Sequence, residues 1–337
     1  MSSHLARYWH YEGSTIRCDL CPHRCAFKHD NDSGRCLVRQ RQASQVSLLN
    51  YGEIAALAVD PVEKKPFYHF YPGHQVLSVG SWGCNFRCRH CQNWQISQQK
   101  YCKEIILPQG LAELTLLAAK QDARIIGLAY TYNEPLVGIE YLIDTAALIR
   151  KNNLKNLLVS NGYVNPEPLQ DLLPFLDAAN IDIKSFNDDF YQEICGHGQL
   201  QTVLGTVEKL LASNVHVELT WLVVPGQNDS DAEIDNFVAW LISLGTEIPV
   251  HFSAYSPRYQ ATWPPTDILF LERLKKKVEK KLPFIYIGNT QRLKDSNIVC
   301  PNCGNTLLDR QSGCINLGMD AGECNICHRS IPGQGLF

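Results

Sequence analysis

The sequence lacks a basic excess, a secretory leader and any long apolar run. Its 31 Lys and Arg residues are outnumbered by 34 Asp and Glu residues, so the net charge is −3. Without a basic surplus, we expect no DNA binding. No uninterrupted apolar run approaches the roughly 18 residues that a membrane span needs, and residues 1–16 contain no apolar core of a signal peptide. These absences predict a soluble cytoplasmic protein that does not contact membranes.

Cysteine, in contrast, is abundant, with 14 in 337 residues. A reducing compartment disfavours disulfides, so metal binding explains this number better. Cys102 and Cys195 stand alone, and we expect both to be small buried residues, although either could lie near the chemistry. The other cysteines form an N-terminal, a central and a C-terminal group: Cys18, Cys21, Cys25 and Cys36; Cys84, Cys88 and Cys91; Cys300, Cys303, Cys314, Cys324 and Cys327.

The central group is a C-x₃-C-x₂-C run that follows the apolar segment 76–79. Three thiolates at this spacing can hold three irons of a [4Fe–4S] cluster and leave the fourth iron open. The motif and its position after a predicted first strand resemble the radical S-adenosylmethionine (SAM) superfamily. That resemblance implies that the open iron binds SAM, which an electron from the cluster cleaves to a 5′-deoxyadenosyl radical. His90 replaces the usual Phe or Tyr before the third cysteine but keeps an aromatic ring there. A zinc loop or a buried thiol cluster is the alternative.

The middle of the chain alternates short β-branched apolar runs with segments of helical period, which is typical of a parallel α/β sheet. Six strands are expected at 75–80, 124–130, 156–160, 179–183, 216–224 and 250–254. Helices are expected at 111–121, 136–152, 168–173, 202–213, 231–244 and 269–281. The resemblance implies a partial (β/α)₆ TIM-like barrel, whose reactive groups lie at the carboxyl ends of the strands.

Polar residues follow several of these strands. The turn Tyr132-Asn133-Glu134-Pro135 resembles the Gly-Gly-Glu-Pro type of turn of radical SAM proteins, in which Glu134 would meet the SAM ammonium and Asn133 would shape the turn. An ordinary strand-to-helix turn with Pro135 beginning the helix is the alternative. The next strand ends in Ser160 and Asn161, which resemble the Thr-Asn of glycyl-radical-enzyme activases and suit the ribose hydroxyls of SAM.

Asp182 and Lys184 lie on one face of the fourth strand and resemble the Asp-x-Lys of the same activases. Lys184 could meet the SAM carboxylate or a substrate, whereas a structural ion pair is the alternative. His251 on the sixth strand is a further candidate for the pocket, although a lone strand histidine is more often structural.

A narrower resemblance rests on three stretches, 18–25, 60–70 and 83–97, together with the cysteine-containing tail. They look like the radical SAM proteins of the AmmeMemoRadiSam system, which belong to the pyruvate formate-lyase activating enzyme-like branch. This resemblance implies AMMECR1-like and Memo-like proteins as partners, and the chemistry implies an external one-electron reductant of the flavodoxin or ferredoxin type. The substrate is not settled by it. The segment 60–70 is expected either to cover the SAM pocket or bind substrate, or to be a surface loop with Lys64 and Lys65 in solvent.

Three domains are expected: a Cys-rich N-terminal extension (1–74), the core barrel (75–290) and a C-terminal module (291–337), with a linker over 288–297. The N-terminal cysteines read as one closed site for zinc or for an auxiliary Fe–S cluster. The tail has zinc-ribbon spacing, CxxC–x₂₀–CxxC, so we expect zinc there, with Cys314 supernumerary. Its ligands would be Cys300, Cys303, Cys324 and Cys327.

These observations predict a radical SAM enzyme that abstracts hydrogen from an unidentified substrate. A glycyl-radical-enzyme activase is one alternative. A small-molecule or RNA-modifying enzyme that uses its N-terminal segment and tail to close or present the substrate is another. A non-catalytic metal-binding adaptor or an Fe–S scaffold protein is the alternative of another class.

Overall fold

The structure is a computed structural model that describes residues 4–290 and 296–337. The predicted boundary at 291 and most of the predicted linker over 288–297 lie outside these residues. In the described part of the chain, the helices are all too short or too polar to cross a bilayer.

One eight-stranded sheet forms the centre of the molecule, in the order β16-β15-β14-β13-β12-β11-β9-β8. All six predicted strands form, and each pairs in parallel with the next. Two edge strands were not predicted: β16 adds a seventh parallel strand, and β8 runs antiparallel to β9. The strands are β8 (Ala56–Pro61), β9 (Gln75–Gly80), β11 (Ile125–Tyr130), β12 (Lys155–Ser160), β13 (Ala178–Asp182), β14 (His216–Val223), β15 (Val250–Ala254) and β16 (Ile285–Gly288).

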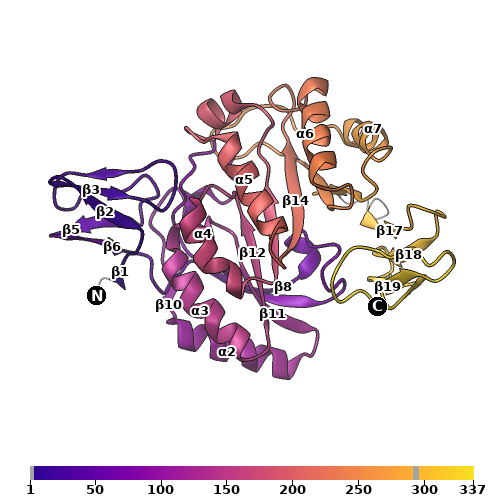
Figure 1. Cartoon of the computed structure of the whole chain (residues 1–337), viewed down its shortest axis with the longest axis horizontal. Coiled ribbons are helices and arrows are strands. Elements are labelled where there is room, and N and C mark those ends of the chain that lie inside the picture. Colours follow the sequence, from indigo (N-terminus) through magenta and orange to yellow (C-terminus); the bar gives the residue numbers. More distant parts are fainter. Residues whose placement is uncertain (1–3, 291–295) are drawn as a thin grey trace.

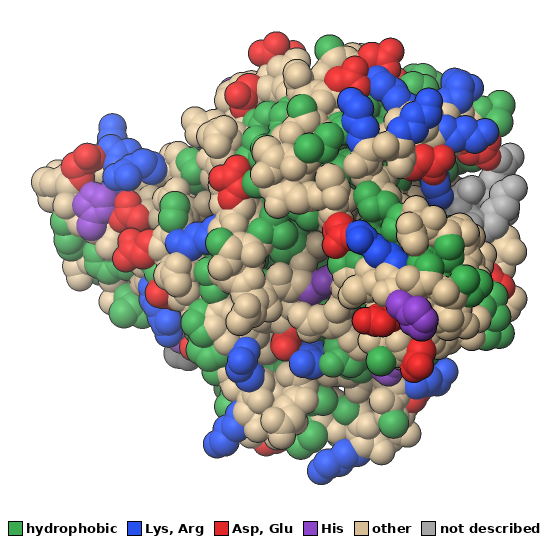
Figure 2. Space-filling model, turned by 45° about the vertical axis from the view of Figure 1, so that its right-hand side comes forward, with side chains coloured by type: hydrophobic (Ala, Val, Ile, Leu, Met, Phe, Trp, Pro, Cys, Tyr) green, Lys and Arg blue, Asp and Glu red, His purple; other side chains and the backbone are tan. Residues whose placement is uncertain are grey.

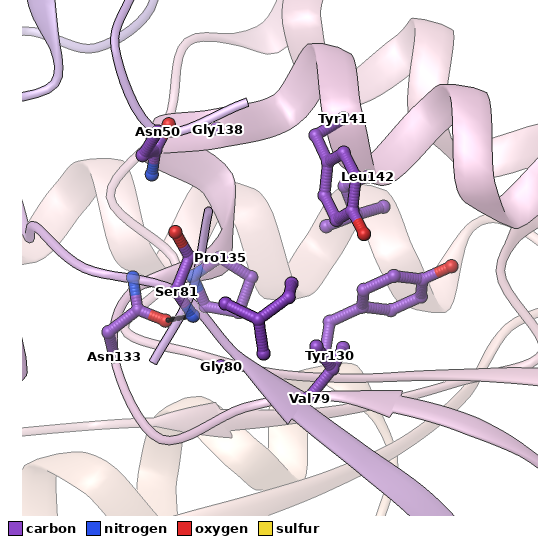
Figure 3. A pocket seen from close by; sticks show the side chains of 11 residues that line it. Asn50, Val79, Gly80, Ser81, Tyr130, Asn133, Pro135, Gly138, Tyr141 and Leu142 are labelled. Carbon is purple, nitrogen blue, oxygen red and sulfur yellow. Dashed lines mark hydrogen bonds between the residues drawn. The ribbon is translucent and has the colours of Figure 1, made fainter. Parts of the chain in front are cut away.

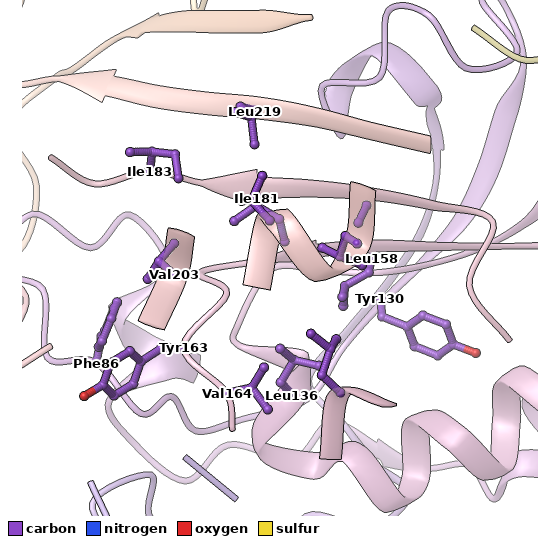
Figure 4. Close-up of a cluster of buried hydrophobic side chains, with 14 of the residues drawn as sticks. Phe86, Tyr130, Leu136, Leu158, Tyr163, Val164, Ile181, Ile183, Val203 and Leu219 are labelled. Carbon is purple, nitrogen blue, oxygen red and sulfur yellow. The ribbon is translucent and has the colours of Figure 1, made fainter. Parts of the chain in front are cut away.

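Helices cover one face of this sheet, as Figure 1 shows for α2 to α5. Leu158, Ile181 and Leu219 project from three neighbouring strands into this layer, where Val203 of α5 meets them (Figure 4). Lys and Arg side chains gather over α7, whose last turn is Lys-rich (Figure 2). The helices are α1 (Trp94–Ser97), α2 (Pro108–Gln121), α3 (Ile139–Lys151), α4 (Pro166–Leu172), α5 (Leu200–Leu211), α6 (Asp231–Leu244) and α7 (Ile268–Val278). Shorter turns are η1 (Val62–Lys64), η2 (Pro135–Gly138), η3 (Leu173–Phe175) and the π-helical η4 (Phe190–Ile194).

Small antiparallel sheets build the two ends of the chain, which lie on opposite sides of the main sheet (Figure 1). The N-terminal strands are β1 (His4–Leu5), β2 (Trp9–Glu12), β3 (Thr15–Cys18), β4 (Ala26–Phe27), β5 (Arg39–Gln42), β6 (Gln45–Leu48) and β7 (Glu53–Ile54), which pairs with β10 (Glu104–Ile105). The C-terminal strands are β17 (Ile298–Val299), β18 (Thr306–Asp309), β19 (Ile315–Asn316), β20 (Met319–Asp320) and β21 (Glu323–Cys324).

The segment 62–71 fills the other face of the main sheet. Phe67 and Phe70 are fully buried there against alanine and leucine side chains of β11, β12 and β13. Lys65 is only 3% exposed and pairs with Asp60 at 2.8 Å, whereas the side chain of Lys64 remains 61% exposed. The expectation of a surface loop with both lysines in solvent is therefore wrong for Lys65 and holds for Lys64, whereas a role in covering the SAM pocket or binding substrate stays a prediction. The aromatic side chains of the segment form an inner core of the sheet.

The C-terminal module packs at the amino end of β16 and onto the segment 62–71. Phe284 and Tyr286 share a core with the module, and the guanidinium of Arg310 lies 4.2 Å above the Tyr68 ring. The backbone amide of Gln334 donates to the carbonyl of His69 at 2.9 Å. The module therefore lies at the amino ends of the strands and does not close over their carboxyl ends.

Candidate functional site

The loop after β9 carries Cys84, Cys88 and Cys91. Phe86 anchors this loop, since its ring is fully buried and packs 4.9 Å from Tyr163. Gly83 begins it with φ +91°, and a methyl group there would lie 2.6 Å from the carbonyl oxygen of Cys36. Only glycine permits both this backbone conformation and this close approach. The three thiols thus follow the carboxyl end of β9, the first of the six predicted strands, as predicted.

These three thiols are held as a group in a low-dielectric setting. Burial raises the pKa of Cys84, and the charges of Glu134 and Cys88 raise it further. Burial and the neighbouring Cys88 likewise raise the pKa of Cys91. A metal centre would have to displace these protons, and its own positive charge supplies the driving force for doing so.

Glu134 lies at the start of η2 with its carboxyl group buried. Its Oε1 accepts from the Ser160 hydroxyl at 2.8 Å and from the Leu136 amide at 3.0 Å, and its Oε2 accepts from the Asn161 amide at 2.8 Å. Burial raises the pKa of Glu134 to about 7, although these hydrogen bonds oppose the shift. Glu134 therefore ties the carboxyl ends of β11 and β12 together.

Two asparagines connect these strand ends to the cysteine loop. The side chain of Asn133 accepts from the Ser81 amide and donates to the Gly83 carbonyl, both at 3.0 Å. The side-chain nitrogen Nδ2 of Asn161 donates to Oδ1 of Asn85 at 2.9 Å and lies 3.8 Å from the sulfur of Cys84. Both predicted residues therefore meet the cysteine loop.

Lys184 follows the end of β13 and also lies near the cysteine loop. Its ammonium lies 2.7 Å from Oδ2 of Asp182. Burial lowers the pKa of Lys184, but the charges of Asp182 and Cys88 outweigh it and raise the pKa overall. Burial and the nearby Lys184 charge together lower the pKa of His90 to about 3. The ion pair and the three cysteines thus form one electrostatic unit.

His251 belongs to a different group of residues. Its Nε2 lies 2.6 Å from Oε2 of Glu218, and its ring contacts Tyr68 and Tyr286. Glu218 also accepts from the backbone amides of Tyr68 and His69. His251 therefore contacts the inner core and the C-terminal module, and its place in the ligand pocket stays a prediction.

The isolated cysteines differ from expectation in one case. Cys102 is exposed rather than buried. Cys195 is fully buried, as expected, and its thiol lies close enough to Cys88 to raise the pKa of that residue. Its carbonyl accepts from the Arg87 amide at 2.7 Å. No sequence spacing relates Cys195 to the central motif, because it lies 104 positions after Cys91.

The C-terminal cysteines form a compact four-sulfur group. Cys300 and Cys327 lie 3.5 Å apart, Cys303 and Cys324 lie 3.6 Å apart, and all four sulfurs lie within 4.8 Å of one another. Tetrahedral zinc with bonds of about 2.3 Å requires sulfurs about 3.8 Å apart, so the group fits this ion. Cys314 lies outside it and contacts Glu63 at 3.3 Å.

The N-terminal cysteines line one small cavity together with Arg35, Arg39 and Asn85. A second cavity lies between the ends of β9 and β11 and the start of α3, lined largely by apolar side chains (Figure 3). Tyr130 and Tyr141 form one side of it, while Asn50, Ser81 and Asn133 lie on the other. Asn133 thus separates this cavity from the cysteine loop.

Comparisons with known proteins agree with this geometry. Residues 80–238 match the family model described as the Radical SAM superfamily. An uncharacterized protein of Methanocaldococcus jannaschii is 38% identical over 330 residues, covering 96% of this chain and 97% of that protein. Pyruvate formate-lyase 1-activating enzyme of Escherichia coli is 28% identical over 183 residues, 54% of this chain and 74% of that enzyme.

Solved structures show the same fold. A radical SAM methyltransferase from Sphaerobacter thermophilus superposes with a TM-score of 0.52 at 13% identity, covering 70% of this chain and 71% of that one. At this identity the likeness concerns the fold alone.

Proposed function

Because the chain belongs to the radical SAM superfamily, we propose that Cys84, Cys88 and Cys91 hold a [4Fe–4S] cluster and that SAM binds beside it. The protein is a radical SAM enzyme of activase-like type. The observation that carries the assignment of the site is the convergence of β11, β12 and β13 on the cysteine loop. Glu134, Asn161 and Lys184 come from three strands, and each lies within electrostatic or hydrogen-bonding reach of these thiols.

The residues around the thiols fit such a group. When bound, a reduced cluster supplies the electron that cleaves SAM. Three thiols in the loop leave one iron without a cysteine ligand from the motif, and Lys184 places a positive charge beside them. The charge of Lys184 favours the extra negative charge of the reduced cluster and suits the SAM carboxylate.

Glu134, Asn133, Ser160 and Asn161 would shape the rest of the SAM site. A carboxylate offers about four acceptor positions, of which Glu134 uses three within the protein. One position therefore remains for the SAM ammonium. Ser160 and Asn161 hold the carboxylate in place, while Asn133 fixes the turn against Gly83.

Further parts of the assignment follow from the same resemblance. We propose that the sheet curves into a partial (β/α)₆ TIM-like barrel over 75–290, preceded by a metal-binding extension and followed by a zinc-ribbon module. The compact Cys300, Cys303, Cys324 and Cys327 group supports zinc in the tail. The N-terminal cysteines would hold zinc or an iron–sulfur cluster. We place the protein in the cytoplasm, within the AmmeMemoRadiSam system, with AMMECR1-like and Memo-like partners and a flavodoxin- or ferredoxin-like reductant.

Two substrate classes remain in competition. The E. coli relative is an activating enzyme, which supports a protein substrate that receives a glycyl radical. A small molecule or RNA is the other class. For this second class, the N-terminal segment and the tail would close or present the substrate, and the tail would do so from the amino end of β16, where it packs.

The test is SAM cleavage by protein reconstituted anaerobically with iron and sulfide and reduced with dithionite. We expect 5′-deoxyadenosine from the wild type and none from a C84A/C88A/C91A triple variant. A C102A variant is the matched control, because Cys102 is exposed and lies outside every cysteine group. An intact cluster spectrum without SAM binding or cleavage would instead support a non-catalytic adaptor or Fe–S scaffold.

A further inference from the structure

The N-terminal cysteines line one cavity but are not gathered as closely as the C-terminal four. Cys18 ends β3, Cys21 and Cys25 lie in the following loop, and Cys36 precedes β5, yet all four line the same cavity. In the described chain, three or more candidate metal-ligand atoms approach within 4.8 Å of one another only in the C-terminal group. The N-terminal sulfurs are thus spread more widely than the four that fit zinc. A cubane cluster requires wider spacing, because each thiolate binds a different iron.

The wall of this cavity also carries unused hydrogen-bond donors. Arg39 is fully buried, and its guanidinium is paired with Glu140 at 2.6 Å. The Nε atoms of Arg39 and Arg35, which both line the cavity, have no hydrogen-bond partner among the described residues. A buried donor without an acceptor is costly, so an acceptor is expected in the space that these residues line. The sulfides and thiolates of an iron–sulfur cluster are such acceptors.

Backbone donors and charge complete the site. The amide of Arg35 donates to the sulfur of Cys25 at 3.3 Å. Arg35 adds positive charge at the wall, whereas the charge of Arg39 is already offset by Glu140. Cys25 is the most exposed of the four, which leaves one side of the cavity close to solvent and to an incoming donor protein.

The cavity adjoins the loop that holds the central cysteines. Asn85 follows Cys84 directly and lines the N-terminal cavity. His23, which also lines it, lies 2.9 Å through Nε2 from the carbonyl of Asn85. On the other side of Cys84, Gly83 packs against the carbonyl of Cys36. The residues on both sides of Cys84 therefore touch the N-terminal site.

We propose that Cys18, Cys21, Cys25 and Cys36 hold a second [4Fe–4S] cluster that relays single electrons to the cluster at Cys84, Cys88 and Cys91. A reduced flavodoxin- or ferredoxin-type protein gives up one electron, which reduces the N-terminal cluster from the 2+ to the 1+ state. That cluster returns to 2+ when the electron passes to the central cluster, and no atoms are transferred. Zinc has no redox chemistry, so a zinc ion at this position could not relay electrons. The electron relay rests on the proposed function, because it needs the central cluster as acceptor. The identity of the metal at the N-terminal cysteines does not depend on that function.

Metal analysis of the wild-type chain tests the identity of the site without any substitution. Anaerobically reconstituted protein should contain about eight irons and about one zinc per chain. A C18A/C21A variant and the C84A/C88A/C91A variant should each retain about four irons, and the C102A control should retain all. About four irons with two zincs in the wild type would overturn the proposal. If the C18A/C21A variant retained no iron while the wild type did, all of the iron would be bound at the N-terminal cysteines. That result would instead overturn the proposed function.

The relay is tested by changing the electron donor. With reduced flavodoxin, 5′-deoxyadenosine formation should fall at least tenfold in C18A/C21A, while with titanium(III) citrate, a small donor that reaches both sites, it should stay within twofold of wild type. Equal rates with flavodoxin would overturn the relay. If C18A/C21A loses activity with both donors, a C25D variant decides, because a carboxylate can still bind iron. It should retain eight irons and shift the midpoint potential of only one of the two reduced-cluster EPR signals. A shift in neither signal would overturn the second cluster.

Discussion

The hydroxyl of Ser160 donates to Oε1 of Glu134 at 2.8 Å and thereby joins the ends of two neighbouring strands. The backbone amide of Asn161 donates to the other carboxylate oxygen of Glu134. Residues at the end of β12 therefore position the carboxylate of Glu134, which follows β11. Burial keeps the pKa of this acid at about 7. Near neutral pH, the fraction of Glu134 that carries the negative charge required by a SAM ammonium therefore depends on the pH.

We expect SAM binding to strengthen with pH through this relationship. Deprotonation of Glu134 between pH 6 and 8 should lower the Kd for SAM by about tenfold. The negative charge of a bound cluster would move this window upward without reversing its sign. The S160A variant removes a hydrogen bond that favours the carboxylate, so its transition should lie at higher pH. Calorimetric titration of SAM into the reconstituted protein measures both effects, and an E134Q variant whose Kd varies with pH as the wild type does would contradict the assignment.

Lys184 should tune the reduction potential of the central cluster. Its ammonium lies near Cys88, and a nearby cation favours the reduced, more negative state. The K184M variant should therefore have a lower midpoint potential, and K184R should remain close to wild type. Redox titration followed by EPR distinguishes this role from a purely structural ion pair, which would alter stability without moving the potential.

The C-terminal module should depend on zinc. Although burial raises the pKa of Cys324, hydrogen bonds from the backbone amides of Cys327 and Ile326 lower it to about 6, so this thiolate is ready to bind metal. The C324S variant should lose about one zinc per chain and expose the module to proteolysis, because metal binding stabilises so small a core. C314S is the matched control and should keep its zinc. Loss of zinc from C314S as well would show that the metal is held differently.

Acid should destabilise the protein through His69. Its Nδ1 lies 2.6 Å from the Pro332 carbonyl and its Nε2 lies 2.5 Å from the Tyr286 hydroxyl, a pattern that suits the neutral ring. Burial lowers the pKa of His69 to about 4 from an ordinary 6.5. The unfolded chain therefore binds a proton between these pH values that the folded chain does not, and the free energy of unfolding falls as the pH drops. The loss is roughly 3 kcal/mol over this range.

Denaturant titrations at pH 6.5 and 4.5 measure this change. The H69Q variant should lose that part of the pH dependence and be less stable at pH 6.5. The exposed His29 provides the matched control, H29Q. An H69Q variant with the full wild-type slope would show that other groups cause the acid sensitivity.

Much of the central sheet could be predicted because its signals are local. The segments 75–80 and 250–254 form strands with the predicted bounds, and helix α6 spans the predicted 231–244. Alternation of β-branched runs and helical periods depends only on neighbours in the chain. Polar residues after parallel strands must also meet at one edge, which is why Glu134, Ser160 and Lys184 gather at the cysteine loop.

The contacts that were missed are between distant segments. The run 285–287 was assigned to no strand because a short apolar run before Gly and Asn also suits a linker. Burial of Phe67 and Phe70 depends on small side chains such as Ala129 and Ala178, which leave space on the inner face of the sheet. Likewise, only the fold brings Cys195 to Cys88, and only the fold carries His251 to Glu218.

Residues 310–334 contact residues 62–71 and hold them in place, which has a consequence for the order in which the chain can fold. Gln334 pairs with Phe70, and Arg310 donates to the Tyr68 carbonyl, so more than two hundred residues separate the partners. During translation, these contacts cannot form until the C-terminal module has left the ribosome. Until then the apolar side chains of Phe284 and Tyr286 lack the core that they share with the module, and such exposed apolar surface makes a nascent chain prone to aggregate.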